Sequence, residues 1–209
     1  YSNLAINEMI RRDYIKEFLG GSGQLGVYKS RKDSIIPKQN WSSLFETLER
    51  RFDNKLAEIN VLWAKFRWYD YNRDMQKAKV FFIELVTKFG IDALSIKMVR
   101  RNNLINHIAW QCGVLETATH KDMTQFISML SSVIDDNIKV YGECATYQYI
   151  DTYAHLLYKV GNRQEAIAQQ ERALKIYQQC LGAIPDKNLD ATYKSLKEAY
   201  DKMLLGKSL

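Results

Sequence analysis

The chain contains little that would break a helix. Its 209 residues include only 2 prolines and 10 glycines, and both prolines, Pro37 and Pro185, lie outside the middle of the chain. A fold of short strands needs a turn about every ten residues, so this scarcity disfavours an all-β architecture. Long apolar runs are also missing, because the most apolar stretch, residues 80–86, is interrupted by Glu84. A membrane-spanning helix needs about 20 apolar residues, so we expect no membrane span.

Residues that build metal and disulfide sites are few and scattered. The 3 cysteines, Cys112, Cys144 and Cys180, form no C-x-x-C pair, and an odd number cannot all pair within one chain. We interpret them as small buried side chains. No two of the 3 histidines stand at a metal-ligand spacing. The net charge of +6 is mild and scattered, so the sequence predicts no metal or other cofactor and no nucleic-acid partner.

Large aromatic side chains are plentiful, with 13 Tyr, 8 Phe and 4 Trp. Apolar residues recur at steps of three and four, as in Ile6, Ile10, Tyr14 and Phe18, and this period is typical of helices. We therefore predict an all-α fold. The expected helices cover residues 3–19, 41–71, 78–89, 92–115, 123–140, 147–160, 164–181 and 189–204. His120, with the two residues after it, is expected in a solvated turn.

Two parts are expected along the chain. Residues 1–40 would form an N-terminal helix and a loop containing glycine and proline, and residues 41–209 a helical-repeat domain; the two could also be continuous. Residues 21–26 fit the pattern G-x-G-x-x-G of nucleotide-binding loops. That motif needs a preceding strand, whereas here a helix precedes it, so we favour a flexible loop.

The expected helices before and after residue 161 form the clearest pair. Ala154 is small where two helices would cross, Leu157 fills the space beside it, and Gly161 supplies the freedom of a tight turn. Ala166 and Ala173 lie on the second helix at the positions that would meet the first. This pattern predicts a helical hairpin with one apolar side, which must stack against neighbouring helices.

Residues 149–176 resemble a tetratricopeptide repeat (TPR), with Ile150, Ala154, Leu157, Gly161, Ala166 and Ala173 at its signature positions. The resemblance implies a TPR-like α-α superhelix, a right-handed stack of antiparallel helix pairs with an N-terminal helix and a C-terminal capping helix. Two residues depart from the repeat. Gln170 stands where the family prefers a large apolar residue, and Gln178 where it often has proline.

Two longer stretches carry a second resemblance. Residues 102–110 read NNLINHIAW and residues 149–161 read YIDTYAHLLYKVG. These are similar to the helical region that follows the thioredoxin domain in many Bacteroidetes envelope proteins, although the thioredoxin cysteine pair is missing here. The resemblance implies a scaffold in the periplasm or cell envelope, with a cytoplasmic location left open.

In tetratricopeptide repeats the first helix of each pair faces the binding groove. The resemblance therefore implies a peptide-binding groove here, with candidate residues Asn103, Asn106, Trp110, Gln148, Asp151, His155, Tyr158 and Lys159. A second aromatic face could be formed by Trp63, Arg67 and Tyr71, which step by four along one helix, although packing against the N-terminal helix is the favoured interpretation.

The sequence favours a binding protein over an enzyme. Asp151 and His155 are four residues apart, which predicts a pair within one helix rather than a catalytic dyad, since no nucleophile is evident beside them. We expect a non-enzymatic helical-repeat scaffold with a protein or peptide partner. The alternative is the helical accessory part of a thioredoxin-family thiol–disulfide oxidoreductase whose catalytic domain lies outside this chain.

Overall fold

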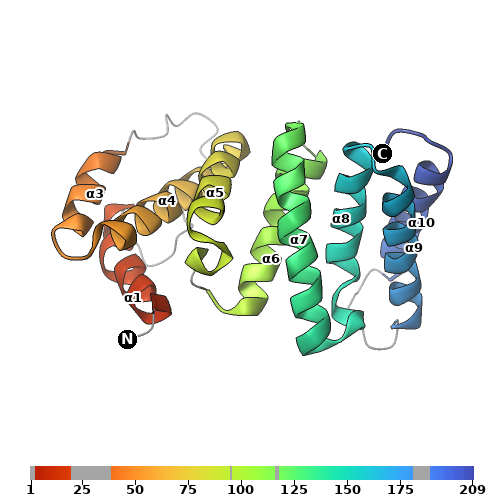
Figure 1. Cartoon of the computed structure of the whole chain (residues 1–209), viewed down its shortest axis with the longest axis horizontal. Coiled ribbons are helices and arrows are strands. Elements are labelled where there is room, and N and C mark those ends of the chain that lie inside the picture. Colours follow the sequence, from red (N-terminus) through yellow and green to blue (C-terminus); the bar gives the residue numbers. More distant parts are fainter. Residues whose placement is uncertain (1–2, 20–38, 95, 116–117, 181–188) are drawn as a thin grey trace. The chain divides into compact units, whose positions relative to one another are not determined.

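The computed structural model describes residues 3–19, 39–94, 96–115, 118–180 and 189–209, which consist of helices and connections without a strand (Figure 1). The prediction of an all-α fold is confirmed for this part of the chain. None of its helices is long and apolar enough to cross a bilayer. The glycine-rich residues 21–26 lie outside the described residues.

Two compact units make up the chain, Tyr1–Arg101 and Asn102–Leu209. The domain boundary expected near residue 40 stays a prediction, because it adjoins residues 20–38, which lie outside the described residues.

The first unit begins with one helical stretch in three parts: α1 (Asn3–Ile10), the π-helical turn η1 (Arg11–Ile15) and α2 (Lys16–Phe18). A π-turn adds a residue to the helical repeat and so shifts the face that points inward. Ile10 and Ile15, five residues apart, are accordingly buried, whereas Tyr14 and Phe18 of the expected four-residue stripe are only half-buried.

The helix expected over residues 41–71 is two helices, α3 (Trp41–Glu49) and α4 (Asn54–Tyr71), so that prediction is wrong. The physical reason is a helix cap: the Asp53 carboxylate accepts a hydrogen bond from the Leu56 N–H at 2.7 Å, which starts a new helix. α5 (Met75–Phe89) packs along α4 (Figure 1), and Phe66 meets Phe82 in their shared core with ring centroids 5.2 Å apart.

The prediction of one helix over residues 92–115 is also wrong. Gly90, at φ +81°, ends α5, and a 3-10 turn, η2 (Ile91–Leu94), follows it. A separate helix α6 (Met98–Ile108) then continues into the π-helical η3 (Ala109–Leu115).

The second unit continues with α7 (His120–Tyr141), the 3-10 turn η4 (Glu143–Ala145), α8 (Tyr147–Lys159), α9 (Arg163–Gln179) and α10 (Leu189–Leu204). His120 starts α7 rather than lying in a turn, because Thr119 and Asp122 form a capping box around it. Figure 1 shows α7 to α10 side by side.

The predicted hairpin of α8 and α9 is confirmed. Gly161, at φ +89°, supplies the turn between them, in the left-handed region that favours glycine. Ala154 and Ala166 are fully buried at the helix contact, together with Leu157 and with Met203 of α10. The small side chains let the two helices approach closely, and α10 covers the apolar side that the hairpin leaves open.

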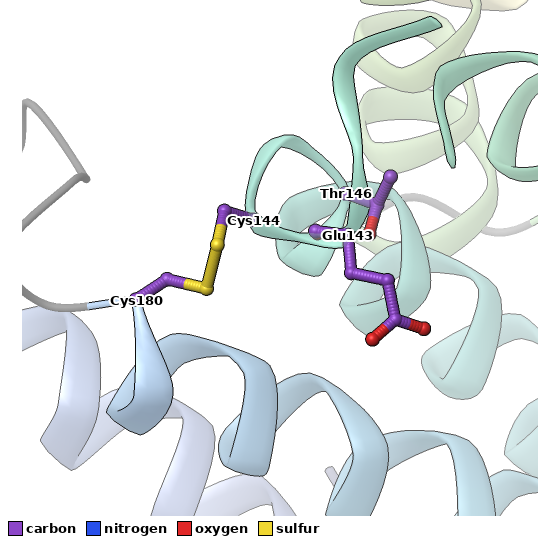
Figure 2. Close-up of a disulfide and its surroundings, with 4 residues drawn as sticks. All are labelled: Glu143, Cys144, Thr146 and Cys180. Atoms are coloured by element: carbon purple, nitrogen blue, oxygen red, sulfur yellow. Dashed lines mark hydrogen bonds between the residues drawn. A yellow bond between two sulfur atoms is a disulfide. The ribbon is translucent and has the colours of Figure 1, made fainter. Parts of the chain in front are cut away.

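The interpretation of the three cysteines as small buried side chains is wrong for Cys144, which is exposed in η4, and it did not foresee a disulfide. Cys144 forms a disulfide with Cys180 at the end of α9 (Figure 2). Cys112 in η3 is buried and lies outside this bond. The bond joins the start and the end of the α8–α9 hairpin, two points 36 residues apart in the sequence.

Candidate ligand-binding site

A cavity of about 420 Å³ lies within the second unit and brings four predicted groove residues together. Asn106 of α6 and Trp110 of η3 form one wall, and Gln148 and Asp151 of α8 form another. The described residues that line it are Asn106, Trp110, Tyr147, Gln148, Asp151, Thr152, Ala191, Thr192, Ser195 and Leu196. We call this space the α8–α10 cavity.

Helical spacing explains how these side chains share one space. Asn106 and Trp110 are four residues apart, as are Gln148 and Thr152, and residues at this spacing lie on the same side of a helix. The third wall comes from α10, whose Ser195 is exposed beside the buried Leu196. Amides, hydroxyls, a carboxylate and an indole thus face the same space, which suits ligand recognition.

Asp151 is the acidic group among the described residues that line the cavity. Its Oδ1 accepts a hydrogen bond of 2.7 Å from Gln170 Nε2 and lies 3.6 Å from His155 Nδ1, so the predicted Asp151–His155 pair within one helix is confirmed. Burial raises the pKa of Asp151, because water cannot fully solvate the carboxylate; His155 and the Gln170 hydrogen bond oppose that rise.

His155 lies beneath the cavity wall rather than in its lining. Its side chain is buried, its ring meets that of Trp110 edge to face at 5.2 Å, and its Nδ1 lies 2.9 Å from the carbonyl oxygen of Asp151. The histidine thus supports Trp110 and Asp151 from behind.

Three of the predicted groove residues make packing contacts elsewhere in the unit. Asn103 accepts a hydrogen bond from the Tyr149 hydroxyl, and the Tyr158 hydroxyl donates to the Lys207 carbonyl at 2.9 Å. Lys159 Nζ donates to the carbonyl of Gly113 at 3.1 Å, and burial lowers the pKa of this amine. These contacts connect α8 to α6, to η3 and to the C-terminal residues.

The contribution of α10 to the cavity was missed from the sequence, where this helix was expected only to cap the repeat. Gln170, a polar residue at an expected apolar position, was the available signal. It is fully buried, and its Nε2 donates both to Asp151 and, at 3.3 Å, to the carbonyl of Leu196 in α10. A polar side chain at such a position indicates polar partners nearby.

The second aromatic face, Trp63, Arg67 and Tyr71, belongs to the first unit. Trp63 is buried, and the Arg11 guanidinium of the N-terminal helix lies 4.1 Å from its ring centroid, which confirms the favoured interpretation of packing against that helix. Arg67 pairs with Asp70 at 3.0 Å, and Tyr71 is half-buried. Burial lowers the pKa of Arg11 to about 9, although its guanidinium also donates to the carbonyls of Ala93 and Leu94.

Within the described ranges, no group of three or more His, Cys, Asp and Glu side chains is arranged to hold a metal ion. The α8–α10 cavity instead offers hydrogen-bonding, aromatic and charged groups. In comparisons with known proteins, no family model matches the chain, and no match appears among the curated proteins or the solved structures.

Proposed function

We propose that the chain is a non-enzymatic helical-repeat protein that binds an extended segment of a protein or peptide in the α8–α10 cavity. The observation that carries this proposal is the convergence of Trp110, Asn106, Gln148 and Asp151 in one open space. An indole offers a rigid apolar contact surface, while amides and a carboxylate can pair with the polar groups of a peptide.

We infer a TPR-like arrangement of the helices, a right-handed stack of antiparallel pairs capped by α10. The close contact of Ala154 with Ala166 supports it, as does the burial of Ile150 and Ala173. In such a stack the first helix of each pair lines the binding surface, which agrees with the position of α8 beside the cavity.

A location in the periplasm or envelope of a bacterium is part of the proposal. The Cys144–Cys180 disulfide supports it, because disulfides persist in oxidising compartments and are rare in the cytosol. The bacterial source, within the Bacteroidetes, follows from the sequence resemblance alone. The accessory-domain alternative stays a prediction from the same resemblance.

A random-sequence peptide library bound to the oxidised protein tests the function. Ser195→Trp adds a large side chain at an exposed position that lines the cavity. Ser132→Trp makes the same change at an exposed position of α7 outside the cavity and is the matched control. We expect peptides enriched on the native protein to lose binding to the Ser195→Trp variant and to keep binding to the control.

Both variants should have native-like circular dichroism, because neither changes a buried residue. Peptides that bind both variants equally would contradict the cavity as the site. A library that yields no binder at all, or turnover of a compound by the purified chain, would overturn the proposed function.

A further inference from the structure

We propose that the α8–α10 cavity recognises the guanidinium of an arginine side chain in the bound peptide. This inference rests on the proposed function and names the chemical group that its site selects. It is carried by two hydrogen-bond acceptors, an aromatic wall and the absence of a competing cation among the described residues of the lining.

The acceptors are Asp151 Oδ2 and Asn106 Oδ1. Both protein contacts of the Asp151 carboxylate within the described structure fall on Oδ1, which leaves Oδ2 available to a ligand. Asn106 Oδ1 is buried and has no hydrogen-bond partner among the described residues. A buried acceptor without a partner costs free energy unless a ligand supplies a donor. Because both unsatisfied atoms are acceptors, the ligand that suits them carries several donors.

The aromatic wall favours a planar cation. Trp110 lines the same cavity as these acceptors, and the buried His155 supports its ring edge to face. A guanidinium can stack on an indole while its N–H groups donate in its own plane. An ammonium has neither the flat face nor the fixed fork of donors, so arginine is preferred to lysine.

The charge of the cavity has the right sign. No lysine or arginine stands among the described residues that line it, and Asp151 is the carboxylate there, although the chain as a whole has a net charge of +6. Burial raises the pKa of Asp151, which means that the folded chain lacks a partner that fully compensates the ionised form. A bound guanidinium would provide that compensation and favour the ionised form of the carboxylate.

Citrulline provides a direct test, because it replaces the guanidinium by a neutral urea of nearly the same shape. We expect arginine in the library peptides that bind the native protein and lose binding to the Ser195→Trp variant. Changing that arginine to citrulline should weaken binding to the native protein at least tenfold, as the loss of a charge-assisted hydrogen bond predicts. Isothermal titration calorimetry measures both peptides.

Asp151→Asn keeps the size of the side chain and removes its charge. This variant should bind the arginine and citrulline peptides with affinities within about threefold of each other. Asp135→Asn, the same change at an exposed site on α7, should keep the full preference for arginine. Equal binding of both peptides to the native protein would overturn the inference and leave the proposed function intact. The same conclusion would follow if the peptides that lose binding to the Ser195→Trp variant contained no arginine.

A second measurement covers the case in which no library peptide binds. Trp110 is the single tryptophan of the second unit, so incorporation of fluorotryptophan gives it a separate ¹⁹F resonance. If N-acetyl-arginine methylamide shifts that resonance and the citrulline analogue does not, the arginine site stands while the proposed function fails. If neither compound shifts the Trp110 resonance and no peptide binds, the arginine site and the proposed function both fail.

Discussion

The Cys144–Cys180 disulfide should supply a large part of the stability of the second unit. Replacement of both cysteines by serine removes a cross-link between points 36 residues apart that enclose the α8–α9 hairpin. The chain-entropy relation for a closed loop of this length gives about 4 kcal/mol at 25 °C. Stabilities of whole domains are typically about 5–15 kcal/mol, so this loss would bring the unit near its unfolding threshold.

Urea unfolding followed by ¹⁹F-tryptophan resonances can assign the loss to one unit. Trp110 reports on the second unit, while Trp41, Trp63 and Trp68 report on the first. We expect the Trp110 transition of the double variant to move to lower urea and the other three to stay in place. The native protein under a strong thiol reductant is the matched control and should unfold with the variant, since both lack the same cross-link.

Two results would refute this reasoning. An unchanged Trp110 midpoint after reduction would mean that the cross-link does not restrict the unfolded chain. An equal shift of all four tryptophans would mean that the two units unfold together, so that the stability change could not be assigned to the hairpin alone.

Three further predictions concern single side chains. Thiol titration of the unfolded, unreduced chain should find one reactive group, Cys112, and three after reduction; three before reduction would contradict the disulfide. Gln170→Glu should lower the free energy of unfolding at pH 7 by about 3 kcal/mol, because it buries a carboxylate beside Asp151, whereas the exposed Gln179→Glu should change it by less than about 0.5 kcal/mol. Urea unfolding measures both changes, and equal effects would contradict the burial argument. Asp151→Asn should stabilise the chain relative to the native protein at pH 7 but not at pH 3. Because the pKa of Asp151 is raised in the folded chain, the stability that the protonated side chain contributes is fully present below the ordinary pKa of 3.8. That stability is lost as the pH rises through the raised pKa. A stability difference that does not grow between pH 3 and pH 7 would contradict it.

The α8–α9 hairpin could be predicted because its signals are local. Small residues at the crossing, such as Ala154 and Ala166, and a glycine at the turn act within one short segment. The break before α4 was missed because the apolar stripe continues across it. The period of the stripe does not show whether one helix continues or whether the Asp53 cap starts a new one. The disulfide was missed because sequence spacing alone does not show that η4 and the end of α9 meet.

The candidate site could be predicted only in part, because the sequence shows the faces of single helices and not the contacts between helices. Asn106, Trp110, Gln148 and Asp151 were identified from one face of each expected helix, and they do share a cavity. Tyr158 and Lys159 were assigned to the groove although the structure uses them for packing contacts. Helical spacing shows which residues share a face of one helix, but it does not show which other helix that face contacts. The contribution of α10 to the cavity depends on such a contact, so it could not be predicted.

The position of Gln170 has a consequence for the C-terminal helix. Its side-chain amide nitrogen carries two N–H groups, which donate at 2.7 Å to Asp151 and at 3.3 Å to the main-chain carbonyl of Leu196, so one amide serves both acceptors. A single uncharged side chain of α9 therefore bridges α8 and α10. Loss of that amide would release both neighbouring helices from α9 at the same point.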